Sequence, residues 1–120
     1  MKKLMIVDNS SYMRMFVKKI IEKGGSYTIF EAESKEESLE LFKNEQPQIV
    51  LLDLNMSEET MDGILVLKDI METSPETIVI IMSAVGHEYV KEECLSYGAK
   101  SFIKKPINAE VLLKTLEEYK

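Results

Sequence analysis

Short apolar runs alternate along the chain with longer stretches in which apolar residues recur every three or four positions. The short runs predict five buried strands, at residues 4–7, 27–30, 49–52, 78–82 and 101–103. A strand that is apolar at every position lies in a sheet covered on both faces, as in parallel α/β proteins. The pattern therefore predicts strands that alternate with helices.

The stretches between the runs carry signals for helix starts and stops. The predicted helices begin after Ser10 or Ser11, after Ser34, near Ile64, near His87 and after Asn108. Ser34 and Glu37 have the spacing of a capping box, and the pair Gly24-Gly25 ends the first helix. Gly98 ends the fourth helix, and Pro106 ends the last strand.

Five strands and five helices in strict alternation favour an α/β fold with a doubly wound parallel sheet. Right-handed crossovers leave few topologies, and the strand order 2-1-3-4-5 is the expected one. The 120 residues suit one domain that spans residues 1–120.

Composition excludes several classes of protein. The formal net charge is −6 and basic residues do not cluster, which argues against direct binding to nucleic acid. No apolar run reaches the ~18 residues of a membrane span. The single cysteine, Cys94, allows no internal disulfide and is expected in the core. We therefore expect a cytoplasmic protein without a membrane span.

Polar residues follow the strands at the edge where such folds bind ligands, the carboxyl ends near the switch point. Asp8-Asn9, Asp53, Ser83 and Lys105 end four different strands. Two carboxylates at this edge repel each other unless a cation lies between them, and Mg²⁺ accepts one or two carboxylates plus water and phosphate. The positive charge of Lys105 and the hydroxyl of Ser83 could hold a phosphoryl group.

Several motifs at these strand ends match one family in register. They are IVDNSSYMR, LLDLNM, MDG, MSA and GAKSFIKKP. With them the whole chain resembles the receiver domains of two-component response regulators, most closely the stand-alone, chemotaxis CheY-like type. The spacing of Asp53, Ser83 and Lys105 agrees with the family pattern.

The resemblance implies a role for each residue of the predicted site. Asp53 would be the phosphoacceptor, and Ser83 and Lys105 would contact the phosphoryl group. The implied Mg²⁺ ligands are Asp8, Asn9, Asp53 and the backbone carbonyl of Asn55. Ser83 and Phe102 would form the switch, with Phe102 rotating inward after phosphorylation. The Lys105-Pro106 bond is often cis in this family.

The resemblance also implies partners. A sensor histidine kinase would supply the phosphoryl group, and a protein partner such as a flagellar switch or chemotaxis component would read the change in trans. We expect a monomer, and no enzyme activity beyond self-phosphorylation and autodephosphorylation.

Two departures from the family pattern leave alternatives open. Asn9 stands where the family usually has a second acid, which weakens the predicted Mg²⁺ site. The loop after Asp53 is two residues longer than usual, and Ser57 replaces its proline. Asn55 and Val85 are expected to influence the lifetime of the phosphoryl group.

The main alternative is a non-phosphorylated interaction module with weakened Mg²⁺ binding. A flavodoxin-like flavin protein is less well supported, because Ser10-Ser11 makes a poor phosphate loop and the chain has no Trp. A dinucleotide-binding enzyme would need GxGxxG after a strand, which is missing.

Overall fold

The structure, a computed structural model, describes residues 2–25, 27–54, 62–84 and 88–119. The strands are β1 (Lys2–Val7), β2 (Tyr27–Ala32), β3 (Ile49–Asp53), β4 (Ile78–Ser83) and β5 (Ser101–Lys104). The helices are α1 (Ser11–Gly24), α2 (Lys35–Glu45), α3 (Asp62–Thr73), α4 (Glu88–Ser96) and α5 (Ala109–Glu118). Strands and helices alternate throughout these residues, as predicted.

The strands form one parallel sheet in the order β2-β1-β3-β4-β5. This confirms the predicted doubly wound α/β fold. The order reverses between β1 and β3, so their carboxyl ends flank the switch point at which such sheets bind ligands. Strand β3 lies in the middle of the sheet, and all five of its residues are buried.

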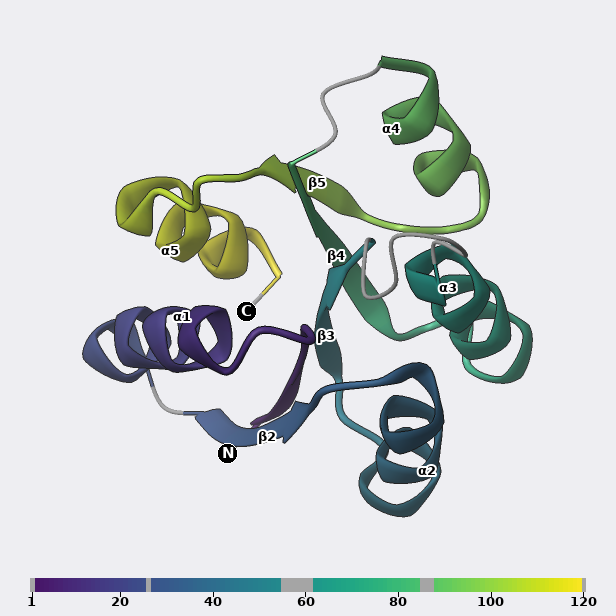
Figure 1. Cartoon of the computed structure of the whole chain (residues 1–120), viewed down its shortest axis with the longest axis horizontal. Coiled ribbons are helices and arrows are strands. Elements are labelled where there is room, and N and C mark those ends of the chain that lie inside the picture. The colour runs from purple at the N-terminus through teal and green to yellow at the C-terminus, as the bar shows by residue number, and fades with distance from the viewer. Residues whose placement is uncertain (1, 26, 55–61, 85–87, 120) are drawn as a thin grey trace.

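Helices cover both faces of the sheet. Figure 1 shows α1 and α5 on one face and α2, α3 and α4 on the other. Successive strand residues point to opposite faces of the sheet. Met5 and Val7 pack with α2, α3 and α4, whereas Leu4 and Ile6 pack with α1 and α5. Burial on both faces is why the strands are apolar at consecutive positions.

The helix starts use the capping residues that the sequence indicates. The side chains of Ser10, Ser34 and Asn108 accept hydrogen bonds from the first turns of α1, α2 and α5. The capping box at Ser34 differs in one detail, because Glu37 accepts from the backbone N–H of Glu33 instead of that of Ser34.

Several strands extend beyond their apolar runs. Strand β1 begins at Lys2, and β3 and β4 continue through Asp53 and Ser83. Ladder hydrogen bonds join backbone groups, so pairing can continue through a polar residue that ends an apolar run. In the part of the chain that the structure describes, no helix is long and apolar enough to cross a membrane.

Candidate functional site

Four strand ends bring the predicted site residues to one edge of the sheet. Asp8 follows β1, Asp53 and Ser83 are the last residues of β3 and β4, and Lys105 follows β5. Asp8 is 1% exposed, Asp53 3% and Ser83 0%. Buried carboxylates are costly unless they are paired, so this edge must supply compensating charge.

Lys105 supplies that charge by bridging the two acids. Its Nζ lies 3.0 Å from Oδ2 of Asp8 and 3.2 Å from Oδ1 of Asp53. The Lys105 side chain is itself only 19% exposed. The sequence predicts Lys105 in the site but not this bridge, because strand order does not give the reach of a side chain. The cation that two facing acids require is thus provided by the chain itself.

The carboxylate of Asp8 is held from two sides. Its Oδ1 accepts the backbone N–H of Ser10 at 2.9 Å, and its Oδ2 faces Lys105. The backbone N–H of Asp8 donates to the carbonyl of Ala32 in β2 at 3.1 Å. These contacts fix Asp8 between the β1–β2 ladder and the start of α1.

Asp53 owes its position partly to a close approach of α3. A Cβ at Gly63 would lie 2.5 Å from the carbonyl oxygen of Asp53 and 2.5 Å from Cα of Leu54. The Gly63 N–H donates to the carbonyl of Leu54 at 3.2 Å. Only glycine lets the start of α3 lie against the backbone of the phosphoacceptor candidate.

Backbone pairing also places Lys105. Its N–H donates to the carbonyl of Ser83 at 2.8 Å, one step beyond the pairing of Ser83 with Lys104. Lys104 is exposed and Lys105 is partly buried, so the lysine that enters the site is Lys105. The Lys105-Pro106 peptide bond is cis, as the resemblance implies.

Two carboxylates and a lysine converge on the switch point of a 2-1-3-4-5 sheet, and residues 4–117 match the response regulator receiver domain. The chain belongs to the response regulator receiver domain family. This receiver is 34% identical to the chemotaxis protein CheY of Bacillus subtilis over 97% of this chain and 95% of that protein. It is 37% identical to CheY of Thermotoga maritima over 98% and 96% of the two chains.

Solved structures agree with the assignment. The CheY-like response regulator receiver domain protein of Methanospirillum hungatei superposes with a TM-score of 0.90 at 26% identity, over 99% of this receiver and 93% of that chain. The response regulator domain of Thermotoga maritima CheB gives a TM-score of 0.82 at 29% identity, over 98% and 92% of the two chains. The receiver therefore has the CheY-like fold over nearly its whole length.

Asn9 and Phe102 lie among the described residues, whereas other residues predicted for the site do not. Asn9 is exposed beside buried Asp8. Phe102 in β5 is half-buried and packs against the core between the sheet and α2, α3 and α4. The predictions for Asn55, Ser57, Val85 and His87 lie outside the described residues.

Cys94 is buried in α4, as expected from the sequence. Burial, together with the nearby charge of Glu93, raises the pKa of its thiol to about 11. A thiol with so high a pKa is a poor nucleophile at neutral pH, so Cys94 is a packing residue.

The donor atoms of the site suit a hard cation. Within the described ranges, no three His, Cys, Asp or Glu residues cluster as metal ligands, and the acids of the site are the pair Asp8 and Asp53. Both carboxylates already face one cation, the ammonium group of Lys105. Carboxylate oxygens such as these are the ligands that Mg²⁺ prefers, together with water and phosphate oxygens.

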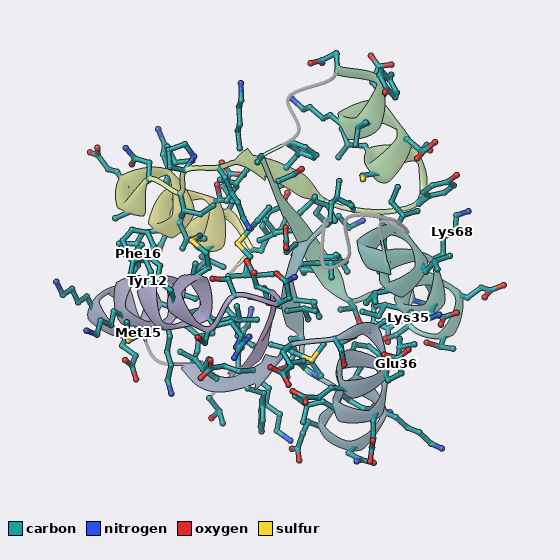
Figure 2. The ribbon with its side chains drawn as sticks, in the orientation of Figure 1. Tyr12, Met15, Phe16, Lys35, Glu36 and Lys68 are labelled. Carbon is teal, nitrogen blue, oxygen red and sulfur yellow. The ribbon has the colours of Figure 1, made fainter. Side chains whose placement is uncertain are left out.

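An apolar groove adjoins the site. It has a volume of about 460 Å³ and runs from Lys105 along α1. Its walls are formed by Tyr12, Met13, Phe16, Ala84, Pro106 and Ile107. Figure 2 shows Tyr12 and Phe16 projecting from the side of α1 that faces α5, and their rings stack with centroids 6.4 Å apart. Apolar side chains exposed in this way are typical of a contact surface.

Proposed function

We propose that this receiver is a signalling switch that accepts a phosphoryl group on Asp53 from a histidine kinase in a Mg²⁺-dependent reaction. The observation that carries the proposal is the pairing of Lys105 with both Asp8 and Asp53 at the carboxyl edge of the sheet. That arrangement brings together a carboxylate that can act as a nucleophile, a second acid that can help to bind a cation, and a positive charge in contact with both.

Asp53 would act as the nucleophile. One of its carboxylate oxygens forms a bond to phosphorus while the P–N bond of the phosphohistidine breaks, and the imidazole leaves with the electron pair. The product is an acyl phosphate on Asp53. Such a transfer depends mainly on positioning and on neutralising the charge of the equatorial oxygens.

Asp8 and Asp53 would hold the Mg²⁺, with the side chain of Asn9 as a neutral oxygen ligand. The bound ion would neutralise charge on the phosphoryl oxygens. Lys105 would exchange its contact with Asp53 for one with a phosphoryl oxygen, because the acyl phosphate carries more charge than the carboxylate. Ser83 would donate its hydroxyl to a second phosphoryl oxygen.

The groove beside Lys105 supports a protein as phosphodonor. A donor histidine must reach Asp53, and a partner seated against Tyr12 and Phe16 would bury apolar surface next to that point. The named relatives are chemotaxis proteins, which favours a chemotaxis kinase as donor and a flagellar switch or related component as receiver of the signal. We propose a cytoplasmic monomer without catalytic turnover of its own.

Phosphorylation would be read through Ser83 and Phe102. If Ser83 moves toward the phosphoryl group, it vacates space that the half-buried ring of Phe102 can enter. Phe102 has no hydroxyl to keep it at the surface. Aromatic NMR with and without beryllofluoride, a phosphoryl mimic, tests this step: the Phe102 ring signals should shift, and unchanged signals would rule out the switch.

Intact-mass measurement after incubation with acetyl phosphate and Mg²⁺ tests the proposed function. We expect one added phosphoryl group in the wild-type protein, none in Asp53→Asn, and little without Mg²⁺. The matched control is Asp69→Asn, which neutralises an exposed acid of α3 and should leave the gain intact. A wild-type protein that gains no phosphoryl group at any Mg²⁺ concentration would contradict the proposal.

A second candidate function is a receiver-fold interaction module that is not phosphorylated. The observation that favours it is that Lys105 already pairs with both acids, while Asn9 lacks the charge that would attract a metal ion. In that case the groove along α1 would bind its partner equally well with and without acetyl phosphate.

A further inference from the structure

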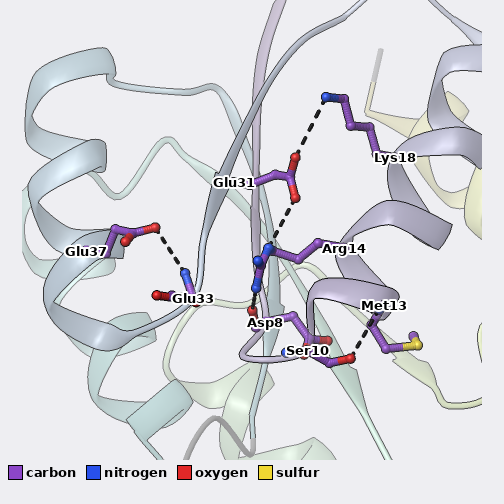
Figure 3. A network of polar contacts seen from close by, with 8 residues as sticks. All are labelled: Asp8, Ser10, Met13, Arg14, Lys18, Glu31, Glu33 and Glu37. Carbon is purple, nitrogen blue, oxygen red and sulfur yellow. Dashed lines mark hydrogen bonds and ion pairs between the residues drawn. The ribbon is translucent and has the colours of Figure 1, made fainter.

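Arg14 reaches from α1 to the segment that carries the candidate metal ligands. Its Nη1 donates to the backbone carbonyl of Asp8 at 2.6 Å, and its Nε donates to Oε1 of Glu31 at 3.1 Å. Lys18 lies 3.7 Å from the other carboxylate oxygen of Glu31. Figure 3 shows Arg14 between Glu31 and Asp8, with Lys18 on the far side of Glu31.

The hydrogen bond from Arg14 to the carbonyl of Asp8 orients more than one residue. The carbonyl that Arg14 binds belongs to the peptide group that joins Asp8 to Asn9. This group is planar, so fixing its oxygen also fixes the direction in which the chain leaves Asp8 and enters Asn9. Both candidate ligands therefore take part of their orientation from one guanidinium group.

The guanidinium group is well suited to this task. The Arg14 side chain is only 13% exposed, and its two contacts use different nitrogens of one rigid plane. Hydrogen bonds from a charged donor are shorter and stronger than neutral ones, which agrees with the distance of 2.6 Å. Glu31, the residue before the last of β2, anchors the guanidinium to the sheet.

We propose that Arg14 is a positioning residue for the divalent cation site, with Glu31 as its anchor. The inference rests on the Mg²⁺ site of the proposed function and deepens it. Arg14 contacts neither the metal nor the phosphoryl group. It holds the Asp8-Asn9 peptide so that both side chains are presented to the ion before it binds, which removes an ordering cost from binding.

The direction in which the Mg²⁺ affinity changes distinguishes a positioning role of Arg14 from a purely electrostatic one. Arg14 is positive, so if it acted only through its field, its removal would strengthen Mg²⁺ binding. If it positions the ligands, its removal weakens binding by about 10- to 100-fold, the usual loss when a residue that orients metal ligands is replaced. Arg14→Lys keeps the charge but not the planar fork, and it should also weaken binding.

The experiment is a Mg²⁺ titration of the whole protein, followed by calorimetry or backbone amide NMR, for wild type, Arg14→Met, Arg14→Lys and Glu31→Gln. Glu31→Gln leaves Arg14 in place and should give a smaller loss of affinity than Arg14→Met. Urea unfolding of each variant shows whether the fold persists. If one Arg14 variant fails to fold, the other still tests the inference.

Lys3 provides a matched control. Like Arg14, Lys3 donates to both a backbone carbonyl and a carboxylate: its Nζ lies 3.3 Å from the carbonyl oxygen of Glu45 and 3.1 Å from the Glu45 carboxylate. Lys3 lies at the opposite end of β1 from Asp8. Lys3→Met should lower stability without changing the Mg²⁺ dissociation constant.

The outcomes distinguish the two claims. Weaker binding in both Arg14 variants, with unchanged binding in Lys3→Met, supports the inference. Unchanged or tighter binding in the Arg14 variants overturns it while leaving the proposed function intact. A wild-type protein that binds no Mg²⁺ overturns the proposed cation site and the inference with it.

Discussion

Replacing Lys105 with Met removes the charge between Asp8 and Asp53 while keeping an unbranched chain of similar length. At N–O distances of 3.0 and 3.2 Å, each ion pair corresponds to about 5 kcal/mol at an effective dielectric constant of about 20. Most of this is offset by the desolvation of the three charges. Removing one partner of a buried ion pair costs about 3–5 kcal/mol. Lys105 is partly exposed, so we expect the lower end, about 3 kcal/mol of unfolding free energy.

The assay is urea unfolding in Mg²⁺-free buffer at pH 7, followed by circular dichroism. Lys104→Met is the matched control, because Lys104 is the exposed neighbour at the end of β5 and should cost little. Asp53→Asn introduced into the Lys105→Met variant removes one of the two carboxylates that have lost the ammonium group and should restore part of the stability.

Mg²⁺ should stabilise Lys105→Met more than it stabilises the wild-type protein, because the ion no longer competes with the ammonium group for the two carboxylates. A Mg²⁺ concentration a hundred times the dissociation constant of the Lys105→Met variant would add about 2.7 kcal/mol to the unfolding free energy of that variant. If Lys105→Met is as stable as Lys104→Met, and Asp53→Asn restores nothing, the two carboxylates do not depend on Lys105 and the account of the site is wrong.

Three further predictions concern single positions. Asn9→Asp should tighten Mg²⁺ binding by at least about tenfold, because a unit charge ~4 Å from a divalent ion is worth about 2 kcal/mol even at the dielectric constant of water; an unchanged titration would show that position 9 is not a ligand. Gly63→Ala should lower the unfolding free energy by about 3 kcal/mol, since its methyl meets backbone atoms. Gly24→Ala is its control and should be nearly neutral, because there the methyl meets the movable end of Leu113; equal losses would refute the argument. Alkylation of Cys94 at pH 8 should be at least about a hundredfold slower in the native protein than in urea, and equal rates would contradict its burial. The stability that the protonated thiol contributes should be full below pH 9 and lost as the pH rises to about 11.

The fold was predictable because burial on both faces leaves a direct mark on the sequence. The central strands, such as β3, are apolar at consecutive positions, and the strict alternation with helical periodicity left one common topology. Strand ends were less clear, since Asp53 and Ser83 continue the ladder although their side chains interrupt the apolar pattern.

The site was predictable as a set of residues but not as a set of contacts. Parallel strand ends bring Asp8, Asp53 and Lys105 to one edge, but which side chain touches which depends on reach and rotamer. Arg14 was missed for a related reason, because an arginine on an amphipathic helix reads as a solvated residue. Glu31 lies in β2, whose end is not one of the four strand ends of the site, but its carboxylate pairs with the guanidinium group that contacts Asp8.

The central claim is that Asp53 carries the phosphoryl group, and chemical trapping tests it most directly. Protein treated with acetyl phosphate and Mg²⁺ is reduced with borohydride, which converts an aspartyl phosphate to homoserine, and is then digested and sequenced by mass spectrometry. We expect homoserine at position 53 and unchanged Asp8. Homoserine at another acid, a phosphoryl group on a different type of residue, or no conversion in a folded protein that binds Mg²⁺ would contradict it.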